Sequence, residues 1–320
     1  MAHPKSITLK QLRALAAIVE TGSITAAAGK LHVTPPAVST QLKTLEDSVC
    51  AQVIKRGPDG KTALTPVGTE LMGTIEKIES ALEQSFERIR AMNDGLAGHI
   101  SIGVVSTGKY FAPGLVADLK KRHPEIDIGL KVGNRDSIVD ALSRGSIEMA
   151  IMGRPPQNPE VDHEVLGEHP YILIASPDNP LADYDEVPPE ALFNETFLTR
   201  EQGSGTRITM RRYLDQIGEG RTYRMIEMGT NETIKQAVMV NLGIAMISAH
   251  TIEAELDHGR LKVLRCPGLP VTRWWHLVHL KDAELSPTAQ AFRAFLLELK
   301  GAYLPQLPNQ AAGAPLKHAV

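Results

Sequence analysis

The sequence predicts an α/β protein in which a small helical head is followed by one long helix and then by a two-lobed domain. Three observations predict this class. The first sixty-odd residues show helical apolar spacing, residues 66–92 show a heptad pattern, and the remainder alternates short apolar runs with amphipathic stretches. A chain of 320 residues is long enough for two or three domains.

The head is predicted to contain a helix from about residue 9 to residue 20, followed by two short helices joined by a tight turn. Ser23 is a good N-cap, and the apolar residues that follow it recur at helical spacing. The second short helix begins with Thr34 as N-cap and Pro35-Pro36 in its first turn, where a missing N–H costs nothing. This is the spacing of a helix-turn-helix.

The exposed face of that second helix carries small or long polar groups that suit base edges and phosphates. Residues 51–64 then predict a hairpin wing around a Pro-Asp-Gly turn. We therefore expect a winged helix-turn-helix at 8–65 whose DNA contacts come from Thr34, Pro35, Pro36, Ser39, Thr40 and Lys43 on the helix and from Arg56 and Lys61 on the wing.

Residues 66–92 predict a long linker helix. Apolar residues recur in steps of four and three, skipping only Ser85, at Leu71, Ile75, Ile78, Leu82, Ile89 and Met92. Such a seam needs a partner, and a second copy of the helix is the simplest one. The alternative is that the helix packs on its own domain.

From residue 93 the pattern changes to strand and helix in turn, which predicts a parallel sheet covered on both faces. A second set of strands and helices follows, and the chain returns for a last strand and helix. We expect two Rossmann-like lobes around a cleft within 93–303, the first formed by 93–160 and 270–303 and the second by 161–269. Residues 304–320 lack periodicity and predict a disordered tail.

Three strand-to-helix junctions near the cleft are suited to anions, because they combine glycines, hydroxyls, free helix N–H groups and nearby arginines. The candidate effector-binding residues are Ser106, Thr107, Lys109, Asn134, Arg135, Arg154, Gln202, Ser204, Thr206, Arg207, Thr230 and Asn231. Each of these hydroxyl and amide groups could equally be an ordinary helix cap, and the arginines could equally form ion pairs.

Composition excludes several classes of protein. No apolar run is long enough to cross a bilayer, the N-terminus lacks a secretion signal, and two cysteines form neither a disulfide framework nor a metal site, so we expect a cytoplasmic protein without cofactor or metal. The histidines are scattered, His276 and His279 are interpreted as packing residues, and no Walker loop or nucleophile elbow is present, so no enzyme is predicted.

The charge is unevenly distributed along the chain. The whole chain has a net charge of −3, but residues 1–65 have a net charge of +4, because they hold eight Lys or Arg and four acids. A positive N-terminal segment suits binding to phosphates.

Together these features resemble the LysR-type transcriptional regulators, over the whole chain up to about residue 303. The C-terminal segments resemble the branch of that family that regulates Calvin-cycle (RuBisCO) operons. They are 103–113, 133–135, 150–156, 200–207 and 229–238. Two positions depart from the family pattern. Pro35 stands where the family usually has glutamine, a residue that can read adenine, so the operator sequence that is recognised can differ. Cys50 stands where a glycine usually ends the helix.

The resemblance implies an effector domain of the periplasmic-binding-protein type, a dimer through residues 66–92 and a tetramer through the effector domains. It also implies promoter DNA and RNA polymerase as partners, and activation of a metabolic operon in carbon fixation or one-carbon metabolism. The effector that the resemblance implies is a small anionic metabolite such as a sugar phosphate, phosphoenolpyruvate or NADPH. The residues themselves equally allow a small carboxylate, such as formate or glycolate, held at one helix N-terminus. The alternative functions are a solute-binding protein and an enzyme, each with a fused nucleic-acid-binding head.

Overall fold

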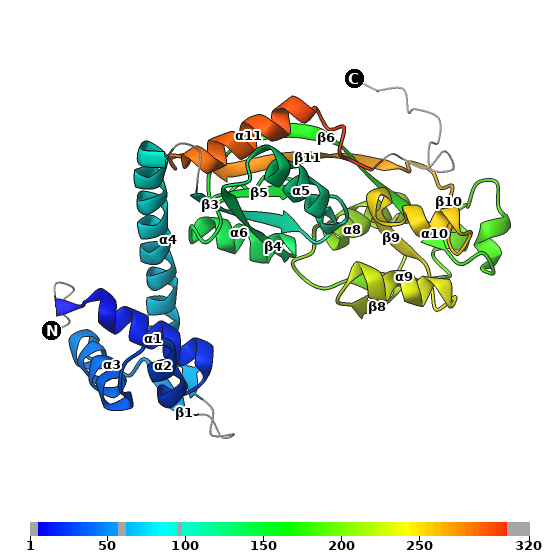
Figure 1. Cartoon of the computed structure of the whole chain (residues 1–320). Coiled ribbons are helices and arrows are strands. Elements are labelled where there is room, and N and C mark those ends of the chain that lie inside the picture. The colour runs from blue at the N-terminus through cyan, green and yellow to red at the C-terminus, as the bar shows by residue number, and fades with distance from the viewer. Residues whose placement is uncertain (1–5, 57–61, 95–97, 306–320) are drawn as a thin grey trace. The chain divides into compact units, whose positions relative to one another are not determined.

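A computed structural model describes residues 6–56, 62–94 and 98–305, except for the side chains of 56, 84, 87, 88 and 90–94. The chain divides into two compact units. One comprises the residues up to Phe86 together with the turn Arg144–Ser146, and the other comprises the remaining residues. The labels of the elements follow Figure 1.

The first unit begins with three helices, α1 (Leu9–Thr21), α2 (Ile24–Lys30) and α3 (Pro35–Val49). Thr8 and Gln11 form a reciprocal capping box at α1, and Ser23 Oγ accepts the Ala26 N–H at the start of α2. Thr34 occupies the N-cap of α3 as predicted, but its side chain makes no capping bond. Cys50 ends α3 with φ 55°, in the left-handed region that explains the usual glycine at this position.

The core of the head lies between these helices. Leu15, Ile18, Ala27 and Leu45 are all completely buried. Because Ala27 contributes only a methyl group to the interface, the helices can approach closely. The wing strands β1 (Ile54–Arg56) and β2 (Thr62–Leu64) pair antiparallel beside this core, which confirms the winged helix-turn-helix.

The linker helix α4 (Pro66–Asp94) divides its apolar seam between two environments. Ile75 is buried in the head core, and Leu71 and Ile78 pack against that core. Farther along, Ile89 of the seam is 51% exposed, and Phe86, which follows the skipped Ser85 and extends the apolar surface there, is 62% exposed. The first half of the seam therefore packs on the core of the head. Among the described residues of α4 from Leu71 on, only the second half of the seam region leaves large apolar side chains exposed to solvent.

The second unit is built on a seven-stranded sheet of order β10-β6-β11-β5-β3-β4, in which β9 also pairs with β6. The strands are β3 (Gly98–Val105), β4 (Ile126–Gly133), β5 (Met149–Met152), β6 (Val161–Ala175), β9 (Ala245–Ser248), β10 (Lys262–Leu264) and β11 (Val271–Leu280). β4, β3 and β5 run parallel, as predicted for the first βαβαβ set. Helices α5 (Ala112–Arg122), α6 (Arg135–Ser143) and α11 (Pro287–Leu299) accompany them, and together they enclose the core of the first lobe.

The second lobe also contains a separate two-stranded parallel sheet of β7 (Thr196–Arg200) and β8 (Arg224–Met228), and an isolated bridge joins Phe197 of β7 to Ile244, the residue before β9. Its helices are α7 (Pro189–Leu192), α8 (Gly205–Gly218), α9 (Asn231–Met239) and α10 (Glu253–Asp257). It contains two apolar cores, one including Tyr213 of α8 and the other including Ile234 of α9. Two lobes with separate cores confirm the predicted two-lobed α/β domain.

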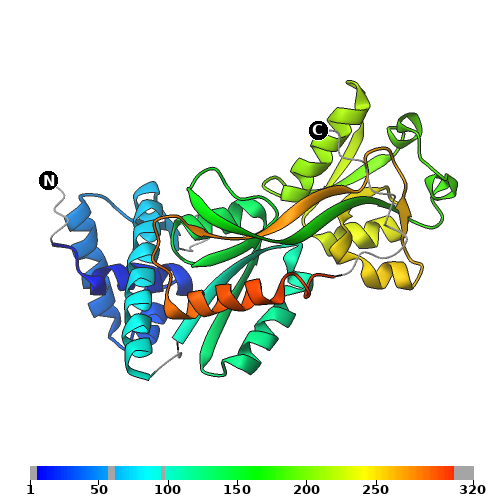
Figure 2. The same cartoon turned by 90° about the horizontal axis from the view of Figure 1, so that it is seen from above.

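Two long antiparallel strands, β6 and β11, join the lobes (Figure 2). The sequence predicts a strand only at 171–175, but β6 begins at Val161, and Leu166 packs in the core of the first lobe. The chain therefore passes from the first lobe to the second within β6, and not at the start of that strand. The pairing shifts register between Trp275 and His276, which places a bulge at the crossing.

Candidate functional site

The first candidate site is the outer face of α3. Thr34, Pro35, Pro36, Ser39, Thr40 and Lys43 are all exposed there, opposite the buried Val38 and Leu42. Lys55 is exposed on β1, whereas the side chain of Arg56 and the whole of Lys61 lie outside the described residues. The helix thus presents hydroxyls and one ammonium on a single face, which is the chemistry of a groove-reading helix.

The hydroxyls on this face differ in their freedom to donate. Thr40 Oγ1 donates to the carbonyl of Pro36 at 2.9 Å, and Thr44 Oγ1 donates to the carbonyl of Thr40 at 2.8 Å. Ser39 makes no such bond within the described part of the chain. Ser39 can therefore donate to or accept from a base, while the threonine oxygens keep only their lone pairs.

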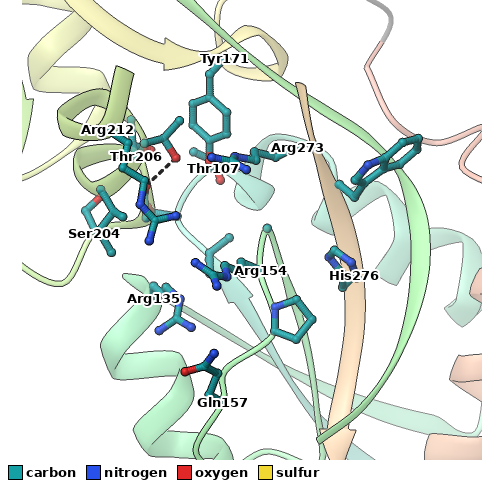
Figure 3. Close-up of a pocket in the computed structure, with 18 residues that line it drawn as sticks. Thr107, Arg135, Arg154, Gln157, Tyr171, Ser204, Thr206, Arg212, Arg273 and His276 are labelled. Atoms are coloured by element: carbon teal, nitrogen blue, oxygen red, sulfur yellow. Dashed lines mark hydrogen bonds between the residues drawn. The ribbon is translucent and has the colours of Figure 1, made fainter. Parts of the chain in front are cut away.

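The second candidate site is a cavity of about 550 Å³ in the second unit (Figure 3). Four arginines line it, namely Arg135, Arg154, Arg212 and Arg273, and none of the described residues in its lining carries a carboxylate. Figure 3 shows these arginines gathered around one hollow. Arg135 lies 3.8 Å from Asp136, whereas Arg154, Arg212 and Arg273 form no ion pair with any described residue. The cavity therefore carries an uncompensated positive charge, which favours anions.

Helix and strand ends supply hydrogen-bond donors to the same cavity. Ser204, Gly205 and Thr206 line it at the N-terminus of the 14-residue helix α8, where the backbone N–H groups are unsatisfied within the helix. Ser204 holds the N-cap position without making a capping bond, so its hydroxyl is not used by the helix. Ser106 and Thr107 line the cavity directly after β3. Such a set binds carboxylate or phosphate oxygens.

Aromatic residues complete the lining. Burial raises the pKa of Tyr171, against the opposing effects of a hydrogen bond with Thr206 and the charge of Arg273, so the phenol stays protonated and can donate. Trp274 and His276 come from β11. Burial, and then the charge of His163, lowers the pKa of His276, which keeps the imidazole neutral at physiological pH.

Six of the twelve effector residues predicted from the sequence line this cavity: Ser106, Thr107, Arg135, Arg154, Ser204 and Thr206. The other six do not. Lys109 pairs with Glu232 at 2.7 Å, and Arg207 donates to the Arg200 carbonyl and pairs with Glu227. Asn134 and Thr230 accept backbone N–H groups at the starts of α6 and α9, and Asn231 accepts from Arg200 at 2.7 Å. Gln202 is exposed outside the lining.

The sequence analysis missed Gln157, Tyr171, Thr209, Arg212, Arg273, Trp274 and His276. Arg212 could have been found, because Thr206, Thr209 and Arg212 recur every three residues on α8 and share a face. His276, which the sequence analysis interprets as a packing residue, packs against His163 with ring centroids 5.3 Å apart and also lines the cavity. The bulge beside Trp275 disturbs the alternation of β11, so strand periodicity gave no reliable signal there.

Within the described residues, no three His, Cys, Asp or Glu side chains come together in a way that could hold a metal. None of the described helices combines the length and apolarity needed to span a membrane.

The comparison with known families decides the class of the protein. Residues 9–69 match the bacterial regulatory helix-turn-helix protein, lysR family, and residues 93–300 match the LysR substrate binding domain. The chain belongs to the LysR family. It is a LysR-type DNA-binding transcriptional regulator, as its resemblance implied.

Full-length relatives of this LysR-family chain carry the names of regulators. It is 46% identical over 309 residues to the HTH-type transcriptional regulator CbbR of Cereibacter sphaeroides, covering 96% of this chain and 100% of that protein. It is 39% identical to the RuBisCO operon transcriptional regulator of Allochromatium vinosum, covering 91% and 96%.

Solved structures of other regulators share the fold. Full-length CbnR complexed with its target DNA has a TM-score of 0.67 at 19% identity, covering 91% of this chain and 99% of CbnR. The regulatory domain of Synechocystis CcmR, in complex with 2-PG, has a TM-score of 0.60 at 30% identity, covering 63% of this chain and 97% of that domain.

Proposed function

We propose that this LysR-type regulator controls a carbon-fixation operon, as an activator, in response to a metabolite that carries more than one anionic group and binds in the arginine-lined cavity. The observation that carries the proposal is the presence of four arginines in a lining to which the described residues contribute no carboxylate. One monovalent ligand such as formate would leave most of that charge uncompensated, whereas a phosphorylated acid or sugar bisphosphate would match it. The cavity volume of about 550 Å³ is also in the usual range for metabolites larger than formate.

Two comparisons support this choice. The relatives at 46% and 39% identity are named CbbR and RuBisCO operon regulator, and the neighbour at 30% identity binds 2-PG. We therefore favour a phosphorylated metabolite over a small carboxylate. The protein would act in the cytoplasm, where promoter DNA lies, and would release the effector unchanged, as a regulator and not as an enzyme.

We propose that the chain dimerises through the second half of the seam on α4. Phe86 and Ile89 are exposed there, and a second copy of the helix would cover them. A dimer presents two α3 helices to successive major grooves of an inverted repeat. A tetramer through the effector domains would bend the promoter, and cavity closure would change the spacing of the heads so that RNA polymerase engages.

The effector proposal is tested by a thermal-shift series on the full-length protein with 2-PG, phosphoenolpyruvate, a sugar bisphosphate, NADPH and formate. A ligand at one hundred times its Kd stabilises the folded state by about 2.7 kcal/mol, and we expect this from a phosphorylated compound. Formate at the same concentration should do much less. Arg212→Gln should remove the shift, because it deletes one cavity charge on an exposed part of α8.

The regulatory proposal is tested with promoter fragments from a carbon-fixation operon. Binding should fall steeply with salt, and the effector should change the footprint without being consumed. An equal thermal shift with formate, or turnover of any compound in the series, would contradict the proposal. So would failure to bind such fragments at low ionic strength.

A further inference from the structure

The guanidinium of Arg200, at the end of β7, connects the two lobes beside the cavity. Arg200 is only 3% exposed, and its Nε and Nη2 donate to the two carboxylate oxygens of Glu201 at 2.7 and 2.8 Å. Its Nη1 donates to Ser106 Oγ at 2.9 Å and to Asn231 Oδ1 at 2.7 Å. Ser106 follows β3 of the first lobe, and Asn231 begins α9 of the second. Arg200 therefore fixes one polar side chain from each lobe.

The chemistry of arginine determines which atoms of these two side chains remain available. A guanidinium only donates, so the Ser106 oxygen and the Asn231 amide oxygen must both be acceptors towards Arg200. This assigns the orientation of the Asn231 amide, because turning it over would set its NH₂ group against N–H donors. The Ser106 O–H and the Asn231 Nδ2–H groups are then left to donate to something else.

The described protein provides no acceptor for either group. Asn231 is 1% exposed, and its Nδ2 is buried without a hydrogen-bond partner among the described residues. Ser106 Oγ makes only the bond from Arg200 within that same part of the chain, and Ser106 lines the cavity. A buried amide donor without an acceptor destabilises the structure that contains it, so an acceptor that reached it would bind with a gain in free energy.

We propose that two groups donate to an anionic group of the effector: the Ser106 hydroxyl, which lines the cavity, and the Asn231 amide, which lies behind that lining and reaches the same anion as the lobes close. Arg200 is the positioning residue that fixes both donors. This inference rests on the proposed function of the cavity and specifies one subsite within it. The subsite takes an oxygen that only accepts, such as that of a carboxylate or phosphate, and it disfavours a hydroxyl that must donate. Because its two donors come from different lobes, an anion held there also favours the closed arrangement of the lobes.

The sharpest test is Asn231→Asp, measured by calorimetry on the full-length protein with 2-PG and with a sugar bisphosphate. Aspartate keeps an oxygen facing Arg200, so the fold should be retained, but it replaces the NH₂ donor with a second acceptor that repels an anion. We expect the Kd to rise at least about 100-fold. Asn194→Asp adds the same charge on an exposed turn outside the cavity lining and should change the Kd less than twofold.

If Asn231 only held Arg200 in place, Asn231→Asp would strengthen that contact and leave the Kd unchanged or lower. That result would overturn the inference while the proposed function stood. Wild-type protein that bound neither these probes nor any other phosphorylated compound of the thermal-shift series would contradict the proposed function, and the inference would fall with it. An unchanged thermal midpoint of Asn231→Asp shows that a rise in Kd is not a folding defect.

The positioning role of Arg200 is tested by a double-mutant cycle with Ser106→Ala and Arg200→Lys. Lysine keeps the charge and can still pair with Glu201, but it cannot hold both acceptors in a fixed plane. Arg200→Lys should weaken 2-PG binding about tenfold in the wild type and less than about twofold in the Ser106→Ala background. Fully additive losses would show that Arg200 does not act through Ser106.

Discussion

The outer face of α3 and the arginine-lined cavity differ in how their side chains are distributed along the chain. The former comes from one 15-residue helix and its cap, whereas the latter is assembled from segments between Val105 and His276. Local spacing therefore specifies the first site, and tertiary structure specifies the second. If this contrast is correct, changes in the cavity should leave DNA binding intact, and changes on α3 should leave effector binding intact.

The largest expected effect is that of charge reversal in the cavity. Arg273→Glu places a carboxylate among three remaining arginines and repels the effector. We expect the Kd for 2-PG, measured by calorimetry, to rise at least about 100-fold, or about 2.7 kcal/mol. Binding to promoter DNA without effector should be unchanged.

Arg221→Glu serves as the matched control, because it makes the same change at an exposed residue of the second lobe that only pairs with Glu190 at 3.5 Å. It should alter neither measurement. Loss of DNA binding in Arg273→Glu would break the contrast between the two sites.

The next largest effect concerns α4, where the same seam is used in two ways. Phe86→Glu should dissociate the dimer, because it puts a charge in the apolar surface that we propose a second copy covers. DNA affinity should fall at least about tenfold, since a single head contacts half as many phosphates. Light scattering after gel filtration would measure the change in mass.

Ile75→Ala is the counterpart in the first half of the seam, where the side chain is 3% exposed. It should leave the dimer intact and lower the free energy of unfolding by about 2–5 kcal/mol, measured in urea. A dimer that survived Phe86→Glu would place the interface elsewhere.

A smaller effect is expected from Lys43→Ala on α3. If Lys43 contacts a phosphate, its loss should weaken DNA binding by about tenfold and lower the slope of log affinity against log salt by about one for each head bound. Anisotropy titrations at several salt concentrations would measure both. Lys77→Ala removes the same charge from an exposed position on α4 and should leave the slope unchanged, while 2-PG binding should be unaffected in both variants.

The head could be predicted from the sequence because its signals are local. Ser23 caps α2, prolines open α3, and the buried face of α3 follows helical spacing. The heptad pattern of α4 was also visible, but the division of its seam was not, because burial of Ile75 depends on the core that the other helices form.

The cavity was only half predictable, because the same residue types cap helices and bind anions. Thr230 and Ser204 both precede a helix, yet Thr230 caps α9 while Ser204 makes no capping bond and lines the cavity. Arg273 lies on a strand that returns from the second lobe, so no spacing relates it to Ser106. The first half of β6 was missed because its burial does not alternate, since it crosses between lobes.

The smallest predicted effect tests the distinction between helix capping and effector binding at Thr230, a residue that the sequence analysis predicts to bind the effector. Thr230 Oγ1 accepts the Thr233 N–H at 3.1 Å, so Thr230→Ala should cost about 1 kcal/mol of unfolding free energy in urea. The Kd for 2-PG should change less than twofold, because Thr230 does not line the cavity. Thr230→Ser keeps the capping oxygen and should restore the stability. If Thr230→Ala instead weakened 2-PG binding tenfold without loss of stability, the junction at α9 would contact the effector as well as cap the helix, and the sequence pattern would have been the better guide.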